Sequence, residues 1–464
     1  MGAFDPQLSR ISKLFLDRDH ASADVALCKR KQFGVVLLCG ADVGQSRTLQ
    51  VAVLTAARIA VRCFPGAVRF VIEPQAASAP LLVWPGAGIA FSKAVEDLVG
   101  AGAALRPDEI GNSGRVIVFG NAPEPAGSLR VTFDGWIAKV GPTSSVKRLA
   151  EREFCSVTGV LAAALALSEL FLSFAEISIQ AGRRAVALSL WRPDLDARDP
   201  QAQGIPVEVL PDALWLLGLG HLGNAYLWTL GTLPYASPEK VRLMLFDFDK
   251  VEDVNVETGM LFGYDDVGQR KTRSCARWAE SVGFQTRMIE RPFDAAFRRR
   301  ADEPGLAFCG FDSNEARRDL GAAGFLRVVE SGLGGTPGNF ETISVHTLPN
   351  SRPPAELWPE LTEEEKEMLR KGQERTANEN AAYLGLSKDA CGRFDLAGKS
   401  VAVPFVGAAA AAIVVAEAIR LLHGGPAYSD MRLRLGTPSE RSAIMVGNYS
   451  ASDVAGLTFC DAQR

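Results

Sequence analysis

The chain has 464 residues, more than a single hydrophobic core usually organises, which predicts two or three domains. Its 47% hydrophobic and 22% charged residues are typical of a soluble globular protein. The net charge of −4, together with the lack of a basic stripe among aromatic residues, argues against a nucleic-acid partner.

Neither an export signal nor a membrane span is expected. The N-terminal segment is too charged for a signal peptide. The longest apolar run, 401–419, contains Pro404 and Glu417, which favours a strand followed by a buried helix over a membrane span. The eight cysteines are scattered and lie mostly in apolar runs, as in a reducing compartment. We therefore expect a cytoplasmic protein that makes no membrane contact.

Short apolar runs alternate with helical stretches along the chain. In order, these strand-like runs are VVLL, VRFVI, RVIVF, LWLL, RLMLF, LAFCG and RVVES. Such alternation predicts an α/β fold with parallel-rich sheets flanked by helices. A stretch rich in proline and polar residues, 197–212, is the expected linker, so we predict one domain over 1–200 and another over 201–464.

The two halves look like unequal copies of one plan. FGVVLLCGADVGQ (33–45) aligns with ALWLLGLGHLGN (213–224), and VIVFGN (116–121) aligns with AFCGFDSN (307–314). GVLAAALALSE (159–169) aligns with GAAAAAIVVAE (407–417). Three matches in the same order indicate a repeat whose first copy lacks two of the glycines and the aspartate of the second.

The second copy contains a glycine turn with acids after it. Gly218, Gly220 and Gly223 follow an apolar run, which predicts a sharp turn from a buried strand into a helix. Asp247 and Asp249 end the next strand. In an open α/β sheet a ligand sits at the carboxyl ends of the strands, where these residues fall. Taken alone, they fit any nucleotide, and Asp247 lies about where an NAD-binding acid would be.

Three further polar residues narrow the choice of nucleotide. They are Asn255, Lys271 in DVGQRKT, and Asp312 in FCGFDSNEAR. Attack on the α-phosphate of ATP builds negative charge, which N–H groups at a helix N-terminus, a lysine and Mg²⁺ stabilise. An aspartate is a natural ligand for Mg²⁺, which prefers hard oxygens. By itself, Lys271 would be a solvated helix residue and Asp312 a helix N-cap, but the whole set indicates ATP.

GLGHLG, DFDKVEDVN, GQRK and DSNEAR, over about 205–440, resemble the motifs of the ThiF/MoeB and ubiquitin-activating-enzyme superfamily. The resemblance implies two Rossmann-like adenylation domains, the first degenerate and the second active, which form a pseudo-dimer within one chain. It implies ATP and Mg²⁺ as cofactors, with the three glycines cradling the phosphates and Asp247, next to Asp249, holding the ribose. Asn255 and Lys271 would contact the phosphates, and Asp312 would lie beside the metal and the α-phosphate.

The chain departs from the family pattern at two points. Where the family usually reads Asn-Leu-Asn-Arg-Gln, this chain reads NVETG over 255–259, so Thr258 replaces an arginine that would grip the triphosphate. There is no CxxC pair, so the structural zinc of many relatives is not expected. In the family, an arginine near the N-terminus of one half reaches the triphosphate of the other. Arg10 is the first candidate here and Arg18 the second, although a solvated arginine on an amphipathic helix fits equally well.

Spacing between the aligned landmarks predicts an insertion over 349–400. In the ubiquitin-activating branch, this interval carries the catalytic cysteine and a loop that crosses over the ubiquitin tail. Cys391 is the cysteine of the insertion and lies in a polar, loop-like stretch, so it is the expected nucleophile. An incidental cysteine, or one used in sulfur transfer, is the alternative. SGLGG (331–335) would let a glycine-ended tail approach ATP, or is a simple loop.

The resemblance implies an enzyme that adenylates the C-terminal glycine of a ubiquitin-like protein. Cys391 would then take the acyl group as a thioester and pass it to a conjugating enzyme, in a bacterial system such as antiviral defence. The alternatives are a sulfur-carrier adenylyltransferase without the thioester, an NAD-dependent oxidoreductase, and a non-catalytic scaffold, which the loss of arginine at Thr258 makes conceivable. Whether two chains also form a homodimer is left open.

Overall fold

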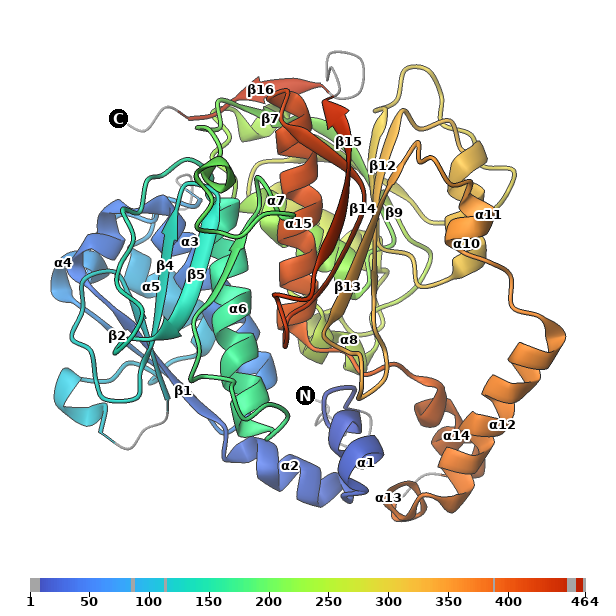
Figure 1. Cartoon of the computed structure of the whole chain (residues 1–464), viewed down its shortest axis with the longest axis horizontal. Coiled ribbons are helices and arrows are strands. Elements are labelled where there is room, and N and C mark those ends of the chain that lie inside the picture. Colours follow the sequence, from blue (N-terminus) through green and yellow to red (C-terminus); the bar gives the residue numbers. More distant parts are fainter. Residues whose placement is uncertain (1–8, 85–87, 112–114, 387–388, 449–455, 462–464) are drawn as a thin grey trace.

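Two β-sheets lie on either side of a layer of long helices in the computed structural model, which describes residues 9–84, 88–111, 115–386, 389–448 and 456–461 (Figure 1). The first sheet has the order β2-β1-β3-β4-β5-β6. Its first four strands are parallel, and β5 and β6 are antiparallel to their neighbours. The strands are β1 (Gly34–Cys39), β2 (Ala67–Ile72), β3 (Arg115–Phe119), β4 (Leu129–Asp134), β5 (Ile137–Pro142) and β6 (Val186–Ser189).

The second sheet has the order β10-β9-β8-β11-β12-β13-β14-β15, parallel as far as β12 and antiparallel beyond it. Without β10 and β15 at its two edges, the second sheet has the same order and directions of strands as the first sheet. This arrangement confirms the predicted fold class of two Rossmann-like units. The strands are β8 (Ala213–Leu217), β9 (Arg242–Phe246), β10 (Gln285–Ile289), β11 (Leu306–Cys309), β12 (Arg327–Leu333), β13 (Thr342–Leu348), β14 (Pro426–Arg434) and β15 (Ser442–Asn448).

Four helices fill the space between the sheets: α3 (Arg47–Cys63), α6 (Val157–Phe174), α7 (His221–Gly231) and α15 (Pro404–Leu422). α6 packs on α3 and α15, and α15 also packs on α7, so the halves share one core. α6 and α15 are apolar and long enough to cross a bilayer, but 89% and 94% of their most apolar windows are buried inside the protein. Both therefore have the character of core helices.

One element of the predicted apolar run is wrong. The strand expected before the buried helix does not form, because α15 begins at Pro404, whose fixed φ suits the first turn of a helix. Residues 401–403 are an irregular lead-in without regular secondary structure. Val401 N donates to Gly335 O at 2.8 Å, which fixes this lead-in against the end of the SGLGG run.

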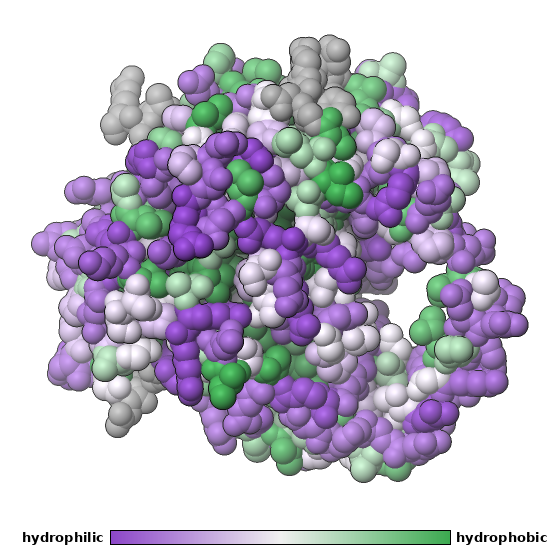
Figure 2. Space-filling view, viewed as in Figure 1, coloured by the Kyte–Doolittle hydropathy of each residue, from purple (hydrophilic) through white to green (hydrophobic). Residues whose placement is uncertain are grey.

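The insertion forms a helical arm that extends from the body, and Figure 2 shows open space between the arm and the body. Its α12 packs on α14, and its α13 packs on α1, the helix that follows the N-terminal segment. Tyr383 of α13 is buried and its hydroxyl bonds to Asp17 (2.6 Å) and Lys13 (2.7 Å) of α1. The helices of the arm are α11 (Pro354–Leu357), α12 (Glu363–Glu379), α13 (Ala381–Leu384) and α14 (Ala390–Gly398).

Shorter elements connect these layers. The expected linker contains β7, which pairs with β16 near the C-terminal end of the chain. The remaining elements used below or shown in Figure 1 are α1 (Lys13–Asp19), α2 (Ala23–Lys31), α4 (Pro74–Ala77), α5 (Phe91–Val99), α8 (Asp253–Thr258), α9 (Lys271–Ser281), α10 (Asn314–Asp319), β7 (Val209–Pro211) and β16 (Leu457–Phe459).

Candidate functional site

The glycine turn joins β8 to α7 at the carboxyl end of the second sheet. Gly218 has a φ of +79°, in the left-handed region that only glycine adopts readily. A Cβ on Gly223 would lie 2.0 Å from the carbonyl oxygen of Gly218, so the helix can start this close to the strand only without a side chain there. Gly220 is the N-cap of α7, and a Cβ on it would meet no atom within 4 Å. The first N–H groups of α7 therefore start beside open space, which suits a phosphate.

Asp247 ties this turn to the end of β9. Its carboxylate is buried and accepts hydrogen bonds from Leu219 N at 2.6 Å and from Asp249 N at 2.8 Å. Burial raises the pKa of the Asp247 carboxyl, while the nearby charge of Lys271 lowers it. The predicted ribose ligand thus already has a structural task in holding the backbone of the turn.

Lys271 and Asp249 form an ion pair at the same edge of the sheet. The distance from Lys271 Nζ to Asp249 Oδ2 is 2.9 Å, and Lys271 N also donates to Asp249 O at 3.0 Å. Lys271 is largely buried at the start of α9, whereas the side chain of Asp249 is 51% exposed. A phosphate arriving at this edge can therefore replace the carboxylate as the partner of the lysine.

Asn255, the predicted phosphate contact, and Thr258, where the family arginine is absent, both form hydrogen bonds within the α8 region. Asn255 Oδ1 accepts a hydrogen bond from Glu252 N at 2.9 Å and caps the helix. Thr258 is buried, and its hydroxyl donates to Val254 O at 3.1 Å within the same helix. Thr258 therefore offers no substitute for the missing arginine.

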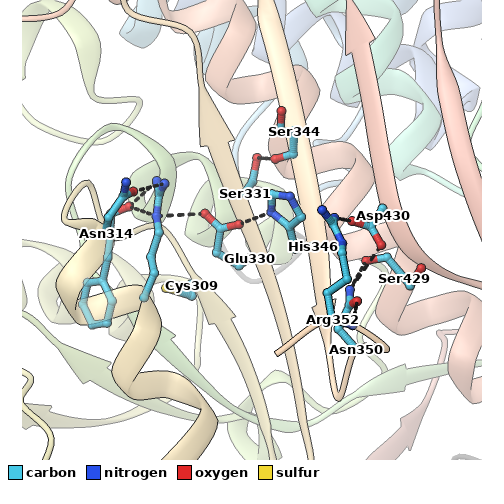
Figure 3. Close-up of polar contacts among 12 residues, drawn as sticks. Cys309, Asn314, Glu330, Ser331, Ser344, His346, Asn350, Arg352, Ser429 and Asp430 are labelled. Carbon is cyan, nitrogen blue, oxygen red and sulfur yellow. Dashed lines mark hydrogen bonds and ion pairs between the residues drawn. The ribbon is translucent and has the colours of Figure 1, made fainter. Parts of the chain in front are cut away.

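Asp312 is exposed just beyond β11. Figure 3 shows polar contacts of the neighbouring strands, among them the contact between Glu330 and His346. Arg317 donates from Nε and Nη2 to Phe311 O at 2.9 and 2.6 Å. The same guanidinium pairs with Glu330 at 3.0 Å, and Glu330 Oε2 lies 2.9 Å from His346 Nδ1. Glu330 is fully buried, so this chain of contacts fixes the residue that precedes Asp312.

Arg10 approaches Asp312 from the N-terminal segment. Its Nε donates to Ser400 O at 2.8 Å, on the lead-in to α15. Burial lowers the pKa of Arg10, and the negative charges of Asp312 and Glu257 oppose that shift. The charge of Arg10 also contributes, after burial, to a pKa of about 3 for His221, the first residue of α7. Arg10 therefore interacts electrostatically with Asp312 and with His221 at the start of α7.

Arg18, the second candidate, is engaged elsewhere. It pairs with Asp19 at 2.6 Å and donates to Ala175 O at 2.9 Å, at the end of α6. Of the two arginines, the structure brings only Arg10 to the predicted site.

The counterpart of this site in the first half is filled by side chains of the protein. Asp42 lies in the turn after β1, where its carboxylate accepts a hydrogen bond from Asn121 N at 2.8 Å and pairs with Arg148. Glu153 covers the start of α3, where it accepts a hydrogen bond from Thr48 N at 3.1 Å. Glu153 thus occupies a backbone donor at the start of α3 that a phosphate would need, and Asp42 occupies another donor nearby in the turn region, which makes the two halves chemically unequal.

Cys391 is exposed, as expected, but it does not lie in a loop. It is the second residue of α14, whose N-cap Asp389 accepts a hydrogen bond from Gly392 N at 2.7 Å. Figure 1 shows α14 on the arm, apart from α7. The structure therefore does not bring Cys391 together with the other predicted residues.

A resident metal site is not built into the part of the chain that the structure describes. No group of three or more His, Cys, Asp or Glu side chains that could hold an ion occurs among those residues. A magnesium ion usually takes one or two protein carboxylates and completes its shell with phosphates and water. Asp312, exposed at the strand end, fits that sparse kind of ligand set.

Comparison with known proteins decides the family. The family model described as the BilD N-terminal domain matches residues 34–190, and the BilD C-terminal domain matches residues 210–425. The bacterial E1-like protein BilD of Collimonas sp. (strain OK412) is 36% identical over 427 residues, covering 91% of this chain and 90% of that protein. The chain belongs to the BilD family of bacterial E1-like proteins. Membership confirms the expected place in the ThiF/MoeB and ubiquitin-activating-enzyme superfamily.

Solved structures are more distant from this BilD-family chain. E. coli MccB aligns at 13% identity with a TM-score of 0.36, over 68% of this chain and 74% of its own. E. coli TcdA, a tRNA N6-threonylcarbamoyladenosine dehydratase, aligns at 16% identity with a TM-score of 0.30, over 45% of this chain and 85% of its own. Similarity at this level identifies no substrate.

Two polar clusters of the BilD-family chain were not predicted from the sequence. One contains Arg317, Glu330 and His346, and its sequence signal is a glutamate inside the apolar run RVVES. The other joins Arg30 to Glu257, which are 227 residues apart. No spacing rule pairs residues this distant, so only the folded structure reveals the second cluster.

Proposed function

We propose that the chain adenylates the C-terminal glycine of a ubiquitin-like protein with ATP and Mg²⁺, and then carries it as a thioester on Cys391. One observation carries the proposal: an open helix start, the Lys271–Asp249 pair, and the opposite charges of Arg10 and Asp312 converge at one edge of the second sheet. Positive charge and N–H donors beside an exposed carboxylate that can bind a metal ion suit a magnesium-bound triphosphate.

In the first step, a carboxylate oxygen of the terminal glycine would attack the α-phosphorus of ATP. A new P–O bond forms, the bond between the α-phosphorus and the bridging oxygen breaks, and pyrophosphate leaves with that electron pair. The N–H groups at the start of α7, Lys271 and Arg10 would balance the charge that builds on the phosphates. Asp312 would hold the magnesium ion, which supplies positive charge on the phosphate oxygens.

In the second step, the thiolate of Cys391 would attack the carbonyl carbon of the acyl-adenylate. The thiol would first lose its proton to solvent. A C–S bond then forms, the C–O bond to AMP breaks, and AMP leaves with that electron pair. Because α14 lies on the arm, this step requires the arm and the α7 region to approach one another. The product would then pass to a cysteine of a conjugating enzyme.

ATP–pyrophosphate exchange with glycine-ended ubiquitin-like proteins tests this proposal. We expect exchange by the unmodified chain, at least a ~100-fold loss in Asp312→Asn, and retention in Cys391→Ser. A protein adduct that thiols cleave should form only when Cys391 is present. Exchange without any adduct would instead support adenylation of the sulfur-carrier type. Failure to bind ATP with Mg²⁺ would support a non-catalytic scaffold.

A further inference from the structure

The two neighbours of Arg10 are held by a buried carboxylate of the other half. Ser9 Oγ donates to the Glu257 carboxylate, at 2.7 Å from Oε1 and 2.9 Å from Oε2. Ile11 N points to Oε2 of the same residue at 3.5 Å, a longer contact. Glu257 thus binds the side chain of Ser9 before Arg10 and the backbone N–H of Ile11 after it.

A buried arginine, Arg30, binds the same carboxylate. We call the cluster of Ser9, Ser12, Arg30 and Glu257 the clamp. Arg30 Nη1, from α2, lies 2.8 Å from Glu257 Oε1 and also donates to Ser9 Oγ at 2.8 Å and Ser12 Oγ at 2.9 Å. Ser9, Ser12, Arg30 and Glu257 are all less than a tenth exposed. A buried ion pair adds little net stability over apolar packing, but removing one partner is costly. In this protein, the Arg30–Glu257 pair fixes the position of the N-terminal segment.

The clamp is built on α8, beside the point where this sequence departs from its relatives. Glu257 lies on the same short helix as Asn255 and directly precedes Thr258. Thr258 occupies the position where the family arginine is expected. Thr258 is turned into its own helix and cannot reach a ligand. The element that has lost a phosphate-binding arginine is therefore also the element that anchors another arginine nearby.

We propose that Glu257, paired with Arg30, is a positioning residue that holds Arg10 in the nucleotide site of a chain that lacks the family arginine at Thr258. This inference rests on the proposed function, because it assigns Arg10 to the triphosphate. The clamp fixes Ser9 and Ile11 to α8, and the hydrogen bond from Arg10 to Ser400 O fixes the guanidinium on the other side. The chain thus supplies the cation of Arg10 from its own first half.

A double-mutant cycle on the exchange reaction tests the clamp. The variant Arg30→Met with Glu257→Leu removes both buried charges together and so leaves no unpaired charge in the core. We expect it to lower the exchange rate ~100-fold, since a displacement of about 1 Å in a positioned group has that effect. In an Arg10→Ala background, the same pair should change the rate less than about threefold, because the residue that it positions is absent.

A matched control separates positioning from stability. Glu417 and Arg420 form another buried pair, on α15 and remote in sequence from the site residues. The variant Glu417→Leu with Arg420→Met removes the acceptor for Tyr428 N and the donor to Leu190 O, so it should lower the free energy of unfolding without changing the exchange rate of the folded enzyme. If both charge-pair variants lower the rate equally, or if the effects of Arg10→Ala and the clamp variant simply add, the proposal is overturned.

Hydrogen exchange gives a readout that does not depend on activity. The peptide spanning residues 9–16 should lose amide protection in the clamp variant, and Ser9→Ala should lose part of it. Unchanged protection overturns the clamp whether or not the enzyme exchanges pyrophosphate. Lost protection in a protein that shows no exchange would retain the clamp as a structural feature, and would overturn both the proposed function and the role of Arg10 at a nucleotide.

Discussion

Single side chains of the second half hold the backbone of the site before any ligand arrives. Asp247 binds the N–H groups of Leu219 and Asp249, and Arg317 binds the carbonyl before Asp312. Residues of this kind make the site rigid, and rigid sites need less reorganisation during a reaction. The effect of changing them should therefore appear in stability as well as in rate.

His221 should make stability depend on pH. Its pKa in the folded protein is about 3, against an ordinary value of 6.5, because the ring is buried and faces Arg10. Between these values the unfolded chain binds more protons, so stability is full above pH 6.5 and falls as the pH drops. We expect up to ~1.4 kcal/mol lost per pH unit from this group between about pH 6.5 and 5.

Urea denaturation at several pH values, compared between the unmodified chain and His221→Gln, measures this contribution. The variant should lack that part of the pH dependence, and an identical slope in both proteins would contradict the assignment. The other histidines are unchanged in the comparison, so they cancel.

Arg317→Met should destabilise the protein by about 3 kcal/mol or more, because it leaves the buried charge of Glu330 without its arginine. Adding Glu330→Gln should restore most of the loss, because the remaining group is neutral. Chemical denaturation of the single and double variants provides the measurement. A double variant no more stable than Arg317→Met would show that the ion pair is not the cause.

At the scale of elements, α1 connects the site to the helical arm. It follows Arg10 directly, and its Asp17 and Lys13 bond to Tyr383 of α13. The arm that bears Cys391 and the segment that bears Arg10 therefore share one contact surface. A movement of the arm toward α7 would therefore displace α1 and, with it, Arg10.

The N-cap of α14 should matter for the thioester step alone. Asp389→Ala removes the acceptor for Gly392 N and should cost about 1 kcal/mol of local helix stability, fraying the turn that presents Cys391. We expect slower adduct formation with unchanged pyrophosphate exchange, and recovery in Asp389→Asn, which also caps helices. An exchange defect in Asp389→Ala would contradict a role confined to the arm.

The sequence predicted those elements whose signal is local. All seven apolar runs named at the outset are strands, because a strand buried on both faces is continuously apolar. The strand expected at the start of the run 401–419 does not form, and the prediction was wrong because apolar residues before a helix look the same as a short strand. The helix at Cys391 was missed because Gly392 and the polar neighbours favour a loop, although Asp389 is a good N-cap. The order and spacing of the glycine turn, Asp247 and Lys271 could be recognised in the sequence. The clamp on Arg10 could not, because Arg30 and Glu257 are 227 residues apart.

At the scale of the whole molecule, the two halves are joined by arginines as well as by apolar packing. Arg62 of α3 donates to Gly259 O at 2.6 Å and to Phe262 O at 3.0 Å, and Arg58 donates to Leu261 O at 2.9 Å. Trp228 of the second half donates to Thr55 Oγ1 of the first at 3.0 Å. The loop after α8 is thus held by the opposite half.

Arg62→Met should lower the free energy of unfolding by roughly 2–4 kcal/mol, because two buried carbonyl groups lose their donor. Unfolding should stay a single transition, with tryptophan fluorescence and circular dichroism changing together, since the halves share a core. Separate transitions in the unmodified chain would show that the halves unfold independently.

The closed turn of the first half, with Asp42 and Glu153 on its backbone donors, has a consequence for stoichiometry. Each chain should hold one nucleotide, although its architecture repeats twice. Because Arg10 and α7 belong to one covalent chain, their local concentration does not change on dilution. Turnover per chain is therefore expected to be the same in a dilute and a concentrated solution, unlike that of an enzyme whose site is shared between separate subunits.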